Sequence, residues 1–118
     1  MSIIVLPLPP DTLRVNHRLG RHWGPLHRDK ADYRTACLLL LKGQVWLVDG
    51  YPVHLEATLY LGKGQRCDPT DAGSWCKVCV DCLVTAGLLA GDSAAHINPF
   101  TARVERDWKN PRVEFRLC

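Results

Sequence analysis

The sequence predicts an α/β (α+β) fold in which a mixed β-sheet packs against two main helices. Residues 53–61 alternate apolar and polar side chains, which is the period of a half-buried strand. Residues 29–42 and 74–86 repeat apolar side chains at helical spacing, a short aliphatic run lies near the N-terminus, and residues 112–117 alternate near the C-terminus. A chain of 118 residues fits one hydrophobic core. We therefore expect a single domain over residues 1–118.

The N-terminal part should form a strand, an irregular segment and the first helix. Residues 2–8 are a short aliphatic run that prolines end, as at a sheet edge. Residues 11–26 contain two glycines and a proline, which break regular structure, and polar side chains typical of a binding loop. The first helix should span residues 29–42 and stop at Gly43. Its apolar face should comprise Ala31, Tyr33, Ala36, Cys37, Leu40 and Leu41.

The C-terminal part should add three strands and the second helix. Residues 53–61 form the most regular strand, and a polar loop, GKGQRCDPTDAG, follows it. Ser74 is a candidate N-cap of a helix that ends near Gly87. Residues 100–106 and 112–117 form two strands, and the short turn between them predicts a hairpin. The second helix should bury Val78, Cys79, Cys82, Leu83 and Ala86.

The overall charge does not identify a partner, but its distribution is uneven. Fifteen Lys and Arg against twelve Asp and Glu give a formal net charge of +3, which is too small to indicate a nucleic-acid partner by itself. Between Arg14 and Arg34, however, there are six basic residues, three histidines and two acids. Such a segment is either a solvated charged loop or a surface that contacts phosphates.

The N-terminus and the cysteines predict the compartment. The opening residues lack a positively charged segment and a small-residue cleavage site, so they do not have the pattern of a secretory signal. Apolar runs such as residues 38–41 are far shorter than the roughly 20 residues that a membrane span needs. We expect a soluble cytoplasmic protein that does not bind membranes, with its six cysteines reduced.

Carboxylates flank the predicted second helix. Asp68 and Asp71 precede it, and Asp92 follows it. A helix that returns against its strand could bring Asp92 near the other two. Carboxylate oxygens suit Mg²⁺, which can activate a water and stabilise an in-line phosphoryl displacement. Acids at a helix N-terminus also have a structural explanation, because they interact favourably with the helix dipole.

Lys77 lies on the first turn of the same helix, and Asp81 lies four residues later. This spacing is that of a surface ion pair, which adds little to stability. An ammonium group there could equally stand beside a scissile phosphate and stabilise the charge that builds up in the transition state. The spacing alone leaves both interpretations open.

A series of short motifs runs through nearly the whole chain. It comprises LPLPP, Val15–Leu19 with Trp23, Arg66–Asp71, Lys77, Asp81–Leu89, Asp92 and His96. No single motif is specific. Their order and spacing resemble those of the RusA family of crossover junction endodeoxyribonucleases, which are Holliday junction resolvases.

The resemblance implies a homodimer that binds four-way-junction or other branched DNA and resolves it by paired nicks, with Mg²⁺ or Mn²⁺ as cofactor. It implies Asp68, Asp71 and Asp92 as metal ligands and Lys77 as a further catalytic residue. Asp71 stands where the family often has Asn, and Gly91 stands where a second acid commonly precedes the last aspartate. An alternative register makes Asp71 the principal ligand. The small size suggests a phage enzyme acting in the host cytoplasm.

With this resemblance, the basic segment is expected to contact the DNA backbone, because contacts with phosphates give an affinity that does not depend on the DNA sequence. The residues expected to contact DNA are Arg14, Asn16, Arg18, Arg21, His22, Arg28 and Arg66.

Two other functions remain open from the sequence. The first is a branched-DNA-binding protein without catalysis, for which Gly91 is a hint. The second is a small metal-binding module, because Cys76, Cys79 and Cys82 form a C-x2-C-x2-C pattern with Cys67 upstream. On a continuous helix these three cysteines cannot all converge on one metal. Core packing of Cys79 and Cys82 is therefore the preferred interpretation.

Overall fold

The computed structural model describes residues 3–14 and 23–118 of the chain. Four of the expected DNA contacts, Asn16, Arg18, Arg21 and His22, lie outside this described part. The elements in chain order are β1 (Ile3–Leu6), the 3₁₀ helix η1 (Asp11–Leu13), α2 (Trp23–Leu41), β2 (Val53–Leu61), α3 (Pro69–Trp75), α4 (Lys77–Thr85), β3 (Ile97–Arg106) and β4 (Arg112–Leu117).

The strands form one mixed four-stranded sheet in the order β1-β4-β2-β3. β4 is antiparallel to both β1 and β2, whereas β2 and β3 run parallel. The predicted α/β fold with a mixed sheet is confirmed, but the predicted hairpin is wrong because β4 does not pair with β3. Val113 and Phe115 make β4 suitable for the centre of the sheet, since both are fully buried. β3 buries Ile97 alone and forms an edge.

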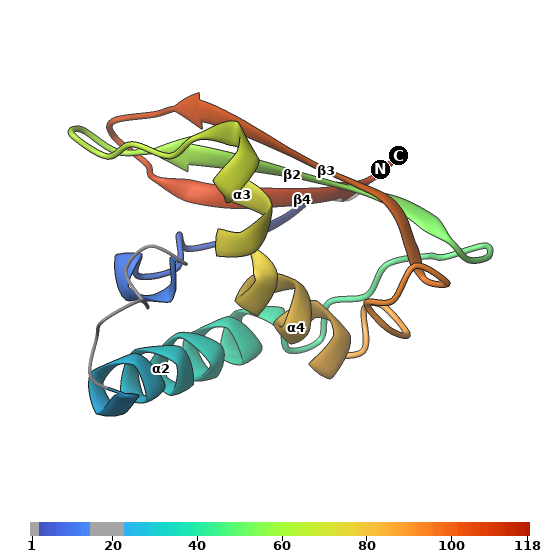
Figure 1. The fold of residues 1–118 in the computed structure, drawn as a ribbon. Helices are drawn as coiled ribbons and strands as arrows, with labels where there is room; N and C mark the ends of the chain where they lie inside the picture. The colour runs from blue at the N-terminus through green and yellow to red at the C-terminus, as the bar shows by residue number, and fades with distance from the viewer. Residues whose placement is uncertain (1–2, 15–22) are drawn as a thin grey trace.

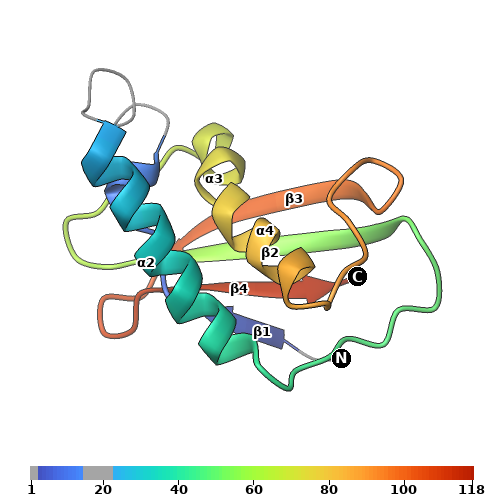
Figure 2. The same ribbon diagram turned by 90° about the horizontal axis from the view of Figure 1, so that it is seen from below.

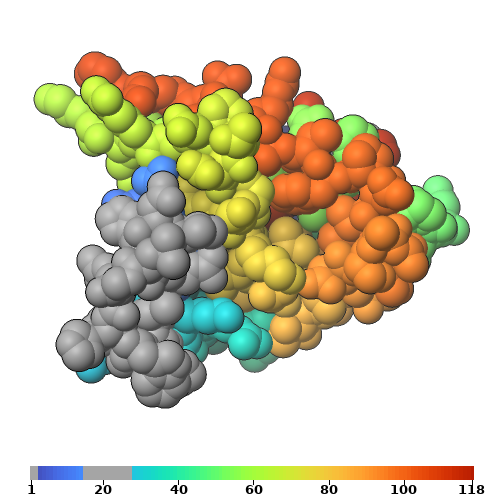
Figure 3. Space-filling view, in the orientation of Figure 1, coloured from blue at the N-terminus to red at the C-terminus, as the bar shows by residue number. Residues whose placement is uncertain are grey.

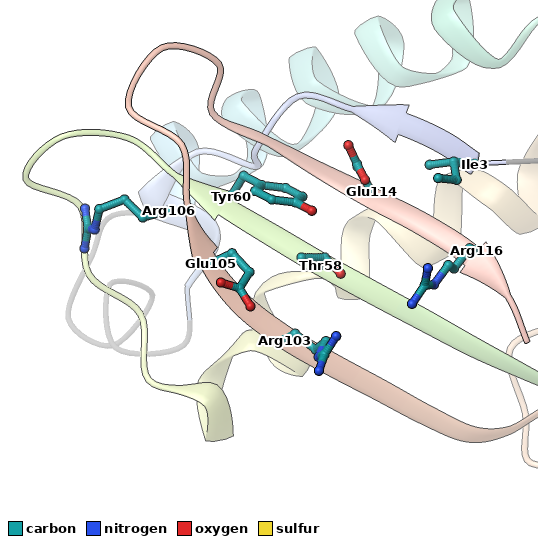
Figure 4. A pocket seen from close by; sticks show the side chains of 8 residues that line it. All are labelled: Ile3, Thr58, Tyr60, Arg103, Glu105, Arg106, Glu114 and Arg116. Atoms are coloured by element: carbon teal, nitrogen blue, oxygen red, sulfur yellow. The ribbon is translucent and has the colours of Figure 1, made fainter.

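The three α-helices cover one face of the sheet, as Figures 1 and 2 show from two directions. The core fills the space between these layers, and Leu55, Ala57 and Leu59 of β2 are completely buried in it. The other face of the sheet is open and carries a shallow hollow of about 370 Å³, lined by side chains of both charges (Figure 4). Among the helices of residues 3–14 and 23–118, none is long and apolar enough to cross a bilayer.

The first long helix differs from its prediction at its start and in its buried face. It begins at Trp23 rather than at residue 29. Pro25 does not prevent this, because the first turn of a helix leaves its N–H groups unpaired in any case. Tyr33, Cys37 and Leu41 form the buried row at intervals of four residues. Three residues expected on that face, Ala31, Ala36 and Leu40, are exposed.

The predicted second helix is divided into α3 and α4. Ser74 was expected to cap it, but Ser74 lies inside α3, whose N-cap is Asp68 with Pro69 in the first turn. Cys76 ends α3 and begins α4. Proline fits the first helical position, because its φ is preset and it needs no hydrogen-bond acceptor. Because of this local preference, the helix begins at Pro69 and not after Ser74.

Gly87 ends α4 and redirects the chain. Its φ of +89° lies in the left-handed region that favours glycine. The N–H of Leu88 bonds to the carbonyl of Leu83, and that of Gly87 bonds to Val84, which is the Schellman arrangement. Leu88 and Leu89 are thereby returned into the core. The predicted stop at Gly87 is confirmed, and it determines where Asp92 leaves the core.

Tyr33 connects α2 to the residue that follows β1 and to α4. Its hydroxyl donates to the carbonyl of Pro7 and lies 3.1 Å from the sulfur of Cys79. Burial raises the pKa of the Tyr33 phenol far above its usual value, and Cys79 adds to the effect. The phenol therefore stays protonated in the folded protein.

We predict that Tyr33→Phe lowers the free energy of unfolding by about 1 to 2 kcal/mol, because the Pro7 carbonyl loses its donor. It should also flatten the fall of stability at high pH. In the unfolded chain a tyrosine releases its proton above about pH 10. The folded protein retains that proton, so stability falls as the pH rises. Urea denaturation at neutral pH and across an alkaline series measures both effects, and an unchanged alkaline slope would contradict the assignment.

Candidate functional site

Lys77 is the centre of a charged cluster at the junction of α3 and α4. It is the first residue of α4, and its Nζ lies 3.0 Å from Oδ1 of Asp81 and 2.6 Å from Oδ2 of Asp92. Asp81 is one turn away on the same helix, whereas Asp92 follows the Gly87 turn. The Schellman turn thus brings Asp92 back to the start of the helix that precedes it.

Lys77, Asp81 and Asp92 interact in ways that favour the charged forms of Lys77 and Asp92. Asp92, together with Asp81, raises the pKa of Lys77 by hydrogen bonding. Lys77 in turn lowers the pKa of Asp92. The side chains of Lys77 and Asp92 are 63% and 42% exposed, and exposed ion pairs contribute little to stability. The cluster therefore orients an ammonium group at the surface without being needed for folding.

Lys77 stands between two hollows on this side of the molecule. One is about 240 Å³ and is lined by Gly73, Lys77, Val80, Asp92, Ile97 and Phe100. The other is about 110 Å³ and is lined by Leu13, Lys30, Ser74, Trp75, Lys77, Val78 and Asp81. Figure 3 shows the yellow surface of α3 and α4 directly beside the orange surface of the segment that leads into β3. The Lys77 side chain is largely exposed, so its ammonium group is accessible to a large ligand from outside.

The loop that carries Asp92 is held by aromatic and polar contacts. The Tyr51 hydroxyl accepts a hydrogen bond of 2.9 Å from the N–H of Ala90. The ring of His96 packs edge-on against Tyr51, and its Nδ1 lies 3.0 Å from the hydroxyl of Ser93. A Cβ on Gly91 would lie 2.7 Å from that Nδ1. His96 therefore explains why a glycine, and no acidic residue, precedes Asp92.

Asp68 and Asp71 lie at the start of α3, and both are exposed. Asp68 occupies the N-cap position, but its side chain makes no capping hydrogen bond. The pKa of the Cys67 thiol is raised mainly by burial, and the negative charges of Asp71 and Asp68 raise it further. Asp68 therefore does not cap the helix through its side chain, although both acids stand at the N-terminus, where the helix dipole favours them. The exposed carboxylate of Asp68 is available to a ligand.

The expected meeting of Asp68, Asp71 and Asp92 at one point is not found. Within the part of the chain that the structure describes, the His, Cys, Asp and Glu side chains with three ligand atoms mutually within 4.8 Å are those of His54, Glu56 and Cys118. The reason is that Asp92 is drawn to Lys77, whereas the other two acids remain at the opposite end of α3.

Arg14 and Arg66, two expected DNA contacts, lie together beside the acidic loop. The guanidinium of Arg14 stacks over the ring of Trp75 at 4.5 Å and donates to the carbonyl of Arg66. It also lies 3.6 Å from Asp11. Arg14 therefore connects η1 to α3, and much of its side chain is engaged within the protein. Arg66 and Arg28, by contrast, are exposed.

The cysteines of the C-x2-C-x2-C pattern pack in the core. Cys76, Cys79 and Cys82 are completely buried, together with Cys37 of α2. Burial raises the pKa of the Cys79 thiol, and a hydrogen bond with Cys76 adds to this effect. The preferred packing role of Cys79 and Cys82 agrees with this burial.

Two residues of the site region were not recognised from the sequence. Trp75 supports Arg14, and Phe100 lines the larger hollow. The ion pair between Lys77 and Asp81, which their spacing of four residues suggests, is present at 3.0 Å. Trp75 and Phe100 gave no local signal, because their roles depend on contacts between distant elements.

No protein-family model matches the chain, and no curated protein matches it.

We predict that Lys77→Met returns the pKa of Asp92 to the ordinary range of aspartate, because Lys77 is the main cause of its lowering. The melting temperature should change little, since the pair is exposed. Carboxyl-carbon NMR titration measures the pKa, and Asp81→Asn serves as the control that leaves Lys77 in place. A pKa of Asp92 that is equal in the wild type and in Lys77→Met would contradict the ion pair.

Proposed function

We propose that the protein is a Mg²⁺-dependent, structure-selective endodeoxyribonuclease that resolves Holliday junctions or other branched DNA by paired nicks as a homodimer. The observation that carries the proposal is the contact of 2.6 Å between Lys77 and Asp92. The two residues are 15 positions apart in sequence, and the RusA-like series of motifs includes both. Their contact leaves an ammonium group exposed beside a hollow, at the end of α3 opposite to the exposed carboxylates of Asp68 and Asp71.

Asp68 and Asp71 are the residues that would hold Mg²⁺. Mg²⁺ keeps several waters and commonly uses one or two protein carboxylates together with substrate phosphates. An uncapped, exposed carboxylate at Asp68 fits that requirement, and Asp71 lies on the same short segment. Mn²⁺ has a similar preference for oxygen ligands. When bound, the ion supplies an activated water and neutralises phosphate charge.

Lys77 would stabilise the negative charge that develops on the phosphate during displacement. Asp92 and Asp81 keep its ammonium protonated and limit its motion. Asp92 acts here as a positioning residue rather than as a direct metal ligand. This division of roles differs from a shell in which all three aspartates bind one ion. It is supported by the finding that, among the described side chains, the ligand atoms of the three aspartates do not lie within 4.8 Å of one another.

The basic side chains nearby would bind the DNA backbone. Arg66 precedes the acidic loop and is exposed, and Lys30 lines the smaller hollow with Lys77. Such contacts offset the repulsion between the aspartates and phosphates. A homodimer would present two sites, one for each strand that is cut, and would widen the surface available to a substrate much larger than one 118-residue chain.

A DNA-binding protein without catalysis is the second candidate. The observation that favours it is that Lys77 already neutralises Asp92, while His96 leaves no room for a further acidic side chain at position 91. Cleavage experiments distinguish this candidate function from that of a nuclease.

We predict paired nicks in an end-labelled four-way junction, with Mg²⁺, and none in a linear duplex of the same sequence. Lys77→Met should lower the single-turnover rate by about 100-fold or more, as loss of a group that stabilises transition-state charge does. Asp68→Asn should raise the Mg²⁺ concentration needed for half-maximal rate. Asp92→Asn should lower the rate at saturating Mg²⁺ without changing that requirement, because it positions Lys77.

Lys109→Met and Asp49→Asn are the matched controls, since both side chains are exposed and lie outside the hollows around Lys77. They should cut at the wild-type rate. Junction binding without cleavage, in Mg²⁺ and in Mn²⁺, would replace the nuclease with the non-catalytic candidate. Equal cutting of the linear duplex would remove the structure selectivity, and a lack of both binding and cleavage would reject the proposal.

We also predict that Arg66→Gln reduces the salt dependence of junction affinity, lowering the slope of log affinity against log salt by about 1, as loss of one phosphate contact does. Arg14→Gln should instead lower the melting temperature, because Arg14 stacks on Trp75 and bonds to the loop. Fluorescence anisotropy at several salt concentrations, with thermal melting of both variants, makes the comparison. A melting temperature lowered more by Arg66→Gln than by Arg14→Gln would contradict these roles.

A further inference from the structure

A second cluster of metal-ligating side chains lies at the other end of β2 from the acidic loop. His54 is near the start of β2 and Glu56 is two residues later, on the same face of the strand. Cys118 directly follows β4, and its N–H bonds to the carbonyl of His54 at 2.9 Å. The antiparallel register, in which Glu56 pairs with Arg116 and Leu55 with Leu117, places Cys118 opposite His54.

The three ligand atoms lie close together. A ring nitrogen of His54, a carboxylate oxygen of Glu56 and the sulfur of Cys118 are all within 4.8 Å of one another. Zinc-ligand bonds of about 2.0 to 2.3 Å put the ligand atoms of a tetrahedral site about 3.5 Å apart. Small side-chain rotations therefore suffice to bring the three atoms onto one ion.

Neighbouring side chains hold two of the ligands in place. Arg116 donates two hydrogen bonds, of 2.6 and 3.0 Å, to Oε1 of Glu56. The other oxygen, Oε2, faces the sulfur of Cys118 at 3.6 Å. Thr101 of β3 lies 3.0 Å from Nε2 of His54. Metal ligands commonly have such outer partners, which orient them.

We propose that His54, Glu56 and Cys118 form a binding site for Zn²⁺, with one nitrogen, one oxygen and one sulfur ligand. A thiolate and an imidazole favour Zn²⁺ over Mg²⁺, because Zn²⁺ prefers softer ligands. The Cys118 thiol binds as the thiolate, and its proton passes to the solvent. Three protein ligands leave a fourth position for water or another ligand.

The site is accessible and separate from the acidic cluster. His54 and Cys118 line a hollow of about 530 Å³, together with residues 45–50, Pro52, Val53 and Leu117. Figure 4 shows Arg116 on the open face of the sheet, away from the helices. Asp68 comes after the far end of β2, beyond the loop that follows Leu61, and it is not part of the group of ligand atoms around His54. The two sites differ in ligand chemistry, and neither requires the other.

The test uses Zn²⁺ and Co²⁺ with the reduced full chain. We expect one Zn²⁺ per chain in equilibrium dialysis, and a thiolate charge-transfer band in the near ultraviolet when Co²⁺ replaces it. Cys118→Ser should abolish the band, and His54→Gln should weaken binding strongly. Thr101→Val should weaken it by about 10-fold, as loss of an outer partner does. Circular dichroism checks that each variant is folded.

Cys67→Ser is the matched control, because Cys67 is a partly exposed cysteine outside this cluster, and it should retain the band. A band that survives Cys118→Ser but is lost in Cys79→Ser would assign the metal to the core cysteines and overturn the proposal. Absence of stoichiometric Zn²⁺ in the wild type would overturn it as well. Neither result bears on junction cleavage, which is measured with Mg²⁺ and the aspartate variants.

Discussion

The parallel pairing of β2 with β3 is the constraint on which the rest of the structure depends. Parallel neighbours cannot be joined by a tight turn, so the chain must cross over the sheet between them. That crossover consists of the acidic loop, α3, α4 and the turn at Gly87. This connection between β2 and β3 contains all four residues of the proposed nuclease site, Asp68, Asp71, Lys77 and Asp92. The cluster around Lys77 is a consequence of this topology.

The same sheet explains the separation of the two proposed sites. Its covered face packs against the helices and carries the core, while its open face exposes the polar side chains of β2 and β4. The acidic residues follow the end of β2 and belong to the helical side. His54 and Glu56 come from the beginning of β2 and belong to the open side. One strand therefore connects two surfaces with different ligand chemistry.

Electrostatics within the Lys77 cluster govern what the proposed nuclease site can do. An ammonium between two carboxylates is kept protonated, and the carboxylate of Asp92 is kept ionised. The exposure of these groups makes their contribution to stability small. Asp68 takes the N-cap position of α3 without a side-chain capping hydrogen bond, so its carboxylate is exposed at the start of that helix.

The sequence by itself determined the fold class, the strand over residues 53–61, and the stop at Gly87, because alternation and glycine act through local geometry. It also singled out Asp68, Asp71, Lys77 and Asp92, which a RusA-like spacing connects. Only the tertiary structure decided that β4 inserts beside β2, that Asp92 reaches Lys77, and that His54 faces Cys118. These depend on which strands pair and where the chain returns. Pairing joins residues far apart in sequence, and no local pattern specifies it.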